Sequence, residues 1–166
     1  RLDSADFDGI SAGALGGVGV SDYTYLTSSP NTRSGPPNIS FIPSGNLHSG
    51  YYRFSVTPEN RVTFIPSHLR CTARSGTYTG IVEAAMIVND REFSMGTNQV
   101  SSSDRPLVFR VPDAAAVPLT ATIEYRLYAW VANGSTLRFD DLEVIGTVGE
   151  AGVGVNDVVV LYPFTG

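Results

Sequence analysis

The clearest pattern of apolar and polar positions runs through residues 121–146. In its first half, apolar residues alternate with polar or aromatic ones, so that the two sides of a strand would differ in polarity. One side holds Ile123, Tyr125, Leu127, Ala129 and Val131, and the other holds Glu124, Arg126, Tyr128 and Trp130. The first set predicts a side that faces a core. The second set spaces an arginine, a tyrosine and the only tryptophan about 7 Å apart on the outer side, which suits a sugar ring or another planar polar ligand.

The second half of this stretch does not fit a simple hairpin. Asn133 and Gly134 are typical of a two-residue hairpin turn. Pairing across that turn would, however, leave each side apolar at one end and charged at the other. A crossing to a second sheet, or a bulge at Asp140 and Asp141, removes the conflict. Either arrangement lets four apolar residues point inward, namely Leu137, Phe139, Leu142 and Val144.

Shorter alternating runs predict further strands. Residues 50–57 and 67–75 alternate clearly, residues 81–88 predict a buried strand, and residues 106–111 predict another. Residues 147–154 are expected to be a flexible connector before a last strand at 155–162. With 17 glycines, 10 prolines and no helical period, the 166 residues predict one domain, 1–166, that is all-β. The expected architecture is a two-sheet antiparallel jelly-roll β-sandwich.

Charge and composition exclude several partners. The formal net charge is −5, and all 11 basic residues are arginine, so no basic footprint for nucleic acid or an anionic membrane is expected. No apolar run of membrane-spanning length occurs. The single cysteine, Cys71, cannot form an internal disulfide and alternates with core residues, which predicts a small buried side chain. Because residue 1 is arginine, we expect the chain to be part of a longer protein.

The outward residues of these strands define a candidate binding face. They are Arg53, Arg70, Arg74, Glu83, Arg126, Tyr128 and Trp130. If their strands share one sheet, they form an arginine-rich face with two aromatic rings. Arginine binds carboxylate and sulfate oxygens in a bidentate manner, and aromatic rings stack on sugars, so the ligand would be a uronate-rich or sulfated polysaccharide. The alternatives are a solvated face of Arg–Glu pairs and a protein-contact surface.

Catalysis finds weaker support in the sequence. A glycosidase needs two carboxylates at one cleft, and the only candidates on strands are Glu83 and Glu124. A lyase would need a base beside an arginine, for which Tyr128, Arg126 and His68 could be combined. The motifs of known lyase strands are absent, and neither histidine lies in a recognisable catalytic motif. The sequence therefore favours a binding module over an enzyme.

Four segments together resemble a known group of proteins. They are residues 51–58, 69–76, 125–130 and 137–146, and they are similar to bacterial extracellular jelly-roll carbohydrate-binding modules appended to polysaccharide-degrading enzymes and surface proteins. The resemblance implies a secreted or cell-surface protein with further domains. It also implies a structural calcium ion held by Asp140 or Asp141 together with Asp8, and carboxylate oxygens are ligands that calcium prefers. The chain has only one tryptophan, unlike better-known sugar binders. We therefore expect it to recognise its sugar mainly through polar side chains.

The function expected from the sequence is non-catalytic binding of a polysaccharide, predicted to be acidic. The alternative is a structural or adhesive surface module that makes protein–protein contacts. In that case the last strand, 155–162, and the small-residue run near the N-terminus would pair with neighbouring domains or chains.

Overall fold

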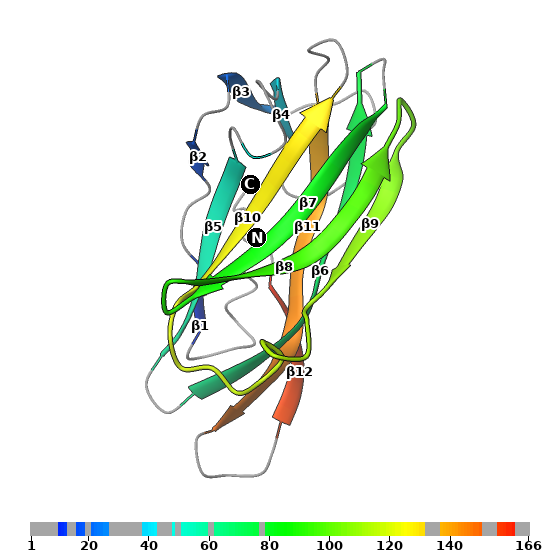
Figure 1. Ribbon diagram of the computed structural model, residues 1–166. Coiled ribbons are helices and arrows are strands. Elements are labelled where there is room, and N and C mark those ends of the chain that lie inside the picture. Colours follow the sequence, from blue (N-terminus) through cyan, green and yellow to red (C-terminus); the bar gives the residue numbers. More distant parts are fainter. Residues whose placement is uncertain are drawn as a thin grey trace.

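The computed structural model describes residues 10–12, 16–18, 21–26, 38–42, 48, 51–59, 62–76, 79–131, 137–150 and 156–161. Every regular element in this part of the chain is a strand (Figure 1). The strands are β1 (Ile10–Ala12), β2 (Gly16–Val18), β3 (Ser21–Leu26), β4 (Asn38–Ile42), β5 (Tyr51–Pro58), β6 (Val62–Ser75), β7 (Gly80–Val88), β8 (Arg91–Val100), β9 (Arg105–Arg110), β10 (Ile123–Val131), β11 (Leu137–Glu150) and β12 (Asn156–Leu161). No helix that could span a membrane occurs within these ranges.

The strands form two stacked antiparallel sheets, which confirms the predicted jelly-roll sandwich. In the front sheet of Figure 1 the order is β1-β5-β10-β7-β8, and β2 also pairs with β5. In the back sheet the order is β3-β4-β11-β6-β9, and β12 also pairs with β11. Apart from the consecutive pairs β3–β4, β7–β8 and β11–β12, paired strands come from separate parts of the chain.

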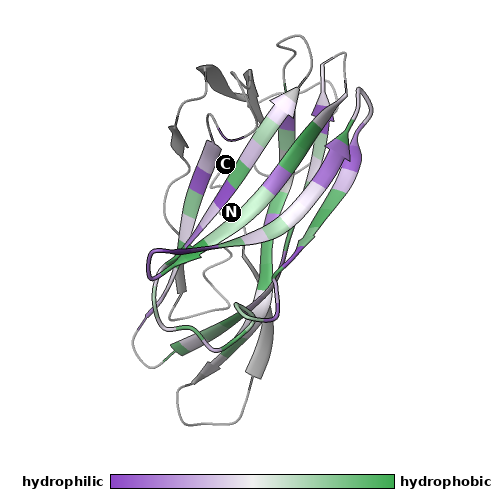
Figure 2. Cartoon of the chain, viewed as in Figure 1, coloured by the Kyte–Doolittle hydropathy of each residue, from purple (hydrophilic) through white to green (hydrophobic). Residues whose placement is uncertain are grey.

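The alternating pattern of the sequence accounts for the core between the sheets. Figure 2 shows polar and apolar residues interspersed along the front strands, as expected of strands with one buried side. The inward residues of β5 and β10 are almost fully buried, and the Phe54 and Tyr125 rings stack with centroids 5.3 Å apart. From the back sheet, Leu69, Cys71 and Ala73 of β6 enter the same core. Burial also raises the pKa of the Cys71 thiol, which is consistent with the predicted inert role.

The chain crosses from the front sheet to the back sheet between β10 and β11. No hairpin joins these strands, because β10 pairs with β5 and β7 whereas β11 pairs with β6, β4 and β12. A register shift in the β11–β6 pairing lies between Asp140 and Glu143. The expected crossing and the expected bulge are therefore both present. Their consequence is as predicted, since Leu137, Phe139, Leu142 and Val144 are all buried.

Two boundaries differ from the prediction. The expected connector at 147–154 is wrong for its first four residues, because β11 continues to Glu150 and pairs with both β6 and β12. The strand expected at 67–75 begins earlier, at Val62, and runs through Pro66 as the single strand β6. Pro66 is tolerated because it lies opposite Gly146 at a second register shift, where a missing backbone donor costs little.

At Gly146 the backbone of β11 passes close to Phe64 and Ile65 of β6. A Cβ atom at this position would overlap the ring of Phe64, which is fully buried, and would lie 2.5 Å from the carbonyl oxygen of Ile65. The backbone of β11 can pass this point only because glycine has no side chain.

Candidate functional site

The outward side chains of β5, β10, β7 and β8 form a continuous surface, which we call the front face. Strand register arranges them in rows that cross the strands. From one end to the other the rows are Trp130–Ile81–Gln99, Tyr51–Tyr128–Glu83–Thr97, Arg53–Arg126–Ala85–Ser94 and Ser55–Glu124–Ile87–Glu92. Polar and aromatic residues that are far apart in sequence thus become neighbours.

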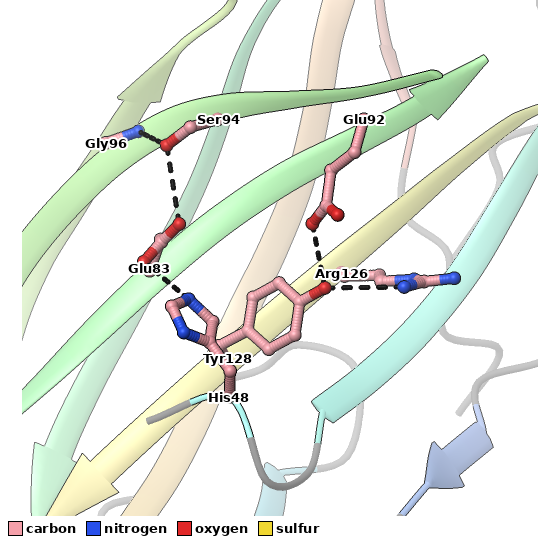
Figure 3. A network of polar contacts seen from close by, with 7 residues as sticks. All are labelled: His48, Glu83, Glu92, Ser94, Gly96, Arg126 and Tyr128. Carbon is pink, nitrogen blue, oxygen red and sulfur yellow. Dashed lines mark hydrogen bonds and ion pairs between the residues drawn. The ribbon is translucent and has the colours of Figure 1, made fainter. Parts of the chain in front are cut away.

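A bulge in β8 adapts this strand to the front face. The pairing of β7 and β8 shifts between Glu83 and Ala85, and Gly96 at this point has a φ of 90°, which favours glycine. The Gly96 backbone N–H donates to Ser94 Oγ at 3.3 Å, and this hydroxyl donates to Glu83 Oε1 at 3.4 Å. The bulge therefore places Ser94 where it helps to orient the Glu83 carboxylate (Figure 3).

Tyr128 is the centre of a polar network on the front face (Figure 3). Its hydroxyl donates to Glu92 Oε1 at 2.8 Å and accepts from Arg126 Nη1 at 3.4 Å. The His48 ring meets the Tyr128 ring edge-on with centroids 4.9 Å apart, and the Tyr51 ring does the same at 5.4 Å. Because these groups surround it, Tyr128 is only 5% exposed. Its predicted outward direction is right, but the ring offers no open stacking surface and acts as a support for its neighbours.

The two arginines of the front face share one carboxylate. Arg126 Nε donates to Glu124 Oε2 at 2.7 Å, and Arg53 Nη1 lies 3.7 Å from Glu124 Oε1. The guanidinium of Arg126 also lies over the Tyr51 ring, 4.4 Å from its centroid. Burial lowers the pKa of Arg126, but hydrogen bonds to Tyr128 and Glu124 raise it, and the net change is upward. Arg126 is thus a fixed cation, while Arg53 keeps about half of its side chain exposed.

His48 was not predicted as part of the site. Its Nε2 atom lies 3.0 Å from Glu83 Oε2, and its side chain is 62% exposed whereas that of Glu83 is 17% exposed. The sequence offered only one hint, which is that His48 lies three residues before Tyr51 at the start of a front strand. Its partners, Glu83 and Tyr128, are 35 and 80 residues away and could not be inferred from local patterns.

Trp130 is the large aromatic residue that the front face leaves open. Its relative exposure is 40%. Of its two row neighbours, Ile81 is partly buried and Gln99 is exposed. An indole has an apolar face and an N–H donor, so it can contact the C–H groups of a sugar while bonding a hydroxyl.

Arg70 and Arg74 do not belong to the front face. Both lie on β6, so they occupy the outer surface of the back sheet. Arg70 Nε donates to Glu143 Oε2 at 3.0 Å, and Arg74 Nε lies 4.0 Å from Asp104 Oδ1. The prediction that all seven residues share one face is therefore wrong for these two. Alternation shows which residues of a strand point outward, but it does not show which sheet the strand joins.

The predicted metal ligands give no geometry to describe. Asp8 lies outside the described residues, and for Asp140 and Asp141 only the strand position, beside the β11 register shift, is described. Among the side chains that are described, no three His, Cys, Asp or Glu residues gather in a metal-binding group. The calcium site stays a prediction.

The catalytic combinations that the sequence allowed are not assembled. His68 lies on the back sheet and bonds Ser67, whereas Tyr128 and Arg126 lie on the front sheet. Glu83 and Glu124 are four register positions apart, about 13 Å along the strands. The carboxylates of known glycosidases are separated by about 5–9.5 Å.

Removing the Tyr128 hydroxyl should have an effect that depends on pH. Burial raises the pKa of Tyr128, the hydrogen bond from Arg126 lowers it and the bond to Glu92 raises it, with a net increase. The neutral phenol therefore stabilises the folded state below about pH 10, and this contribution is lost as pH rises through the raised pKa. We expect Tyr128→Phe to cost about 1 kcal/mol at pH 7 and less at pH 11, measured by urea unfolding. A difference that does not change with pH would contradict this account.

Comparisons with known proteins concern the fold. No protein-family model matches the sequence, and no curated protein sequence matches it significantly. Its structural neighbours are carbohydrate-binding modules. A family 4 module shares 16% identity over 76% of each chain, with a TM-score of 0.49. A family 29 module complexed with cellulohexaose shares 14% identity over 87% of this chain and 93% of that one, also at 0.49. Another, complexed with mannohexaose, shares 16% over 87% and 83%, at 0.45. Likeness at this level assigns no ligand and no residue roles to this chain.

Proposed function

We propose that the front face binds a polysaccharide without catalysing a reaction on it. The observation that carries this proposal is the exposed indole of Trp130 beside rows of hydrogen-bonding side chains that are already held in place. The indole supplies an apolar contact for a sugar ring. Arg53, Glu83 and Gln99 supply donors and acceptors for hydroxyl groups. Hydrogen bonds with His48 and Ser94 hold the Glu83 carboxylate before a ligand arrives, which reduces the entropy that binding costs.

The charged residues of the front face indicate whether the polysaccharide is acidic or neutral. The sequence predicted an acidic polysaccharide because seven outward residues included four arginines. Only two arginines lie on the front face, Arg53 and Arg126, and both are near Glu124. With Glu83 and Glu92 the described front face has one negative charge in excess, so its charge favours a neutral polysaccharide over an acidic one.

The alternative, a structural or adhesive module, receives less support from the described strands. Its premise was that the terminal strand and the N-terminal run would pair with neighbouring domains or with other chains. β12 instead pairs with β11 from Val144↔Leu161 to Gly149↔Asn156, and β1 and β2 pair with β5. In our proposal the module belongs to a larger secreted protein, where it would raise the local concentration of a tethered partner on the polysaccharide.

Affinity electrophoresis tests the proposal and the charge of the ligand together. We expect retarded migration in native gels that contain a neutral polysaccharide, such as glucomannan or hydroxyethylcellulose, and little retardation by polygalacturonate. Running each gel with calcium and with EDTA tests the predicted metal at the same time. Retardation by polygalacturonate alone would reverse the charge assignment. Migration unaffected by every polysaccharide would remove the proposed function.

A further inference from the structure

A cavity of about 270 Å³ lies at the opposite end of the front sheet from Trp130. It is walled by the β7–β8 hairpin and by the 111–122 connection between β9 and β10. Its apolar lining includes Val88, Phe93, Ala115, Val117 and Leu119. Val88 and Ala115 also belong to the hydrophobic core, and Leu119 packs against it. The cavity is therefore a space at the end of the core that side chains do not fill.

Arg91 gives this apolar cavity one positive charge. In the β7–β8 pairing Arg91 lies opposite Val88 and two residues before Phe93, so both residues fall on the inward side of β8. The guanidinium lies over the Phe93 ring, with its Cζ atom 4.6 Å from the ring centroid. Arg91 is an exposed residue, so its guanidinium reaches water and places the positive charge at the open side of the cavity.

No carboxylate of the described residues pairs with Arg91. Its contact in this part of the chain is the Phe93 ring. Five other arginines each have a carboxylate within 4.0 Å, namely Arg53, Arg70, Arg74, Arg110 and Arg126. Stacking on Phe93 holds the guanidinium plane while leaving its N–H edge free to donate to an incoming anion.

We propose that this cavity binds a small aromatic carboxylate. The ring would be buried against Val117, Leu119 and Phe93, and the carboxylate would accept bidentate hydrogen bonds from Arg91. The volume of about 270 Å³ is slightly below the roughly 300–1,000 Å³ that is usual for ligand pockets, so a single ring is the size that fits. The site is independent of the proposed polysaccharide face, because Val88 is seven residues along β7 from Ile81, the row neighbour of Trp130.

Titration of the protein with benzoate, followed by amide NMR, tests this proposal. We expect the largest shifts at Ala114, Ala115 and Val117, and we expect benzamide to bind about tenfold more weakly or worse, because it lacks the charge that Arg91 recognises. Arg91→Leu should weaken benzoate by a similar factor. Arg105→Leu is the matched control, since it removes the same charge from an exposed residue outside the cavity and should bind benzoate as the unmodified protein does.

A second variant keeps the test decisive if Arg91→Leu does not fold. Val117 is 41% exposed, so Val117→Trp adds a ring at the cavity with little demand on the core, and it should abolish benzoate binding. Equal binding of benzoate and benzamide by the unmodified protein would overturn the proposal. Benzoate shifts that persist in Val117→Trp would also overturn it, because they would place the anion elsewhere.

Discussion

Trp130→Ala should lower the affinity for the polysaccharide by about tenfold or more while leaving the fold intact. The indole is 40% exposed, so a large part of the ring is available to a ligand, while the remainder packs against neighbouring side chains. Retardation in affinity gels that contain glucomannan should therefore largely disappear. The free energy of unfolding, measured with urea, should fall by only about 1–2 kcal/mol, because the indole is partly buried.

A matched control separates this effect from a general loss of apolar surface. Val108 is 51% exposed and lies on β9 at the edge of the back sheet. Val108→Ala should leave migration in the gel unchanged. Equal losses in the two variants would show that the front face is not the binding surface, even if the protein does bind a polysaccharide.

Gly146→Ala should destabilise the fold by about 1–3 kcal/mol, the usual cost of adding atoms to a packed interior. The new methyl group would overlap the Phe64 ring and approach the Ile65 carbonyl oxygen, so either the ring or the pairing of β11 with β6 must shift. Urea unfolding measures this cost. Thr147→Ala, at the next and partly exposed residue, is the control and should change stability by about 0.5 kcal/mol or less.

A double variant shows which contact is responsible. In Phe64→Leu the ring is gone, so adding Gly146→Ala to it should cost less than adding it to the unmodified protein. Part of the cost should remain, because the Ile65 carbonyl belongs to the backbone and stays in place. Full additivity of the two changes would exclude the Phe64 ring as the cause.

The direction of side chains was largely readable from the sequence. Alternation identified the inward residues of β5, β10 and the second half of β6, and the conflict around Asn133 and Gly134 indicated a crossing to a second sheet or a bulge. These inferences succeed because side chains of a strand point to opposite sides with a period of two. The same rule explains why Arg70 and Arg74 were wrongly placed on the front face, because it contains no information on which distant strands pair.

The state of Tyr128 illustrates what remained beyond the sequence. Its position predicted an exposed ring, yet it is covered by His48 and Tyr51 and bonded to Glu92. Each of these partners comes from a different segment of the chain. Their convergence depends on strand order and register, which long-range packing decides, and no local propensity encodes it.

The pairing of β1 and β2 with β5 has a consequence for shortened versions of the protein. These two short strands cover the outer edge of β5 along Tyr51–Arg53 and Val56–Pro58, beside the front face. Deleting the first 20 residues would leave that edge with unpaired backbone donors and acceptors. An uncovered edge invites pairing with other chains, so such a deletion would promote aggregation at the margin of the surface that carries Arg53.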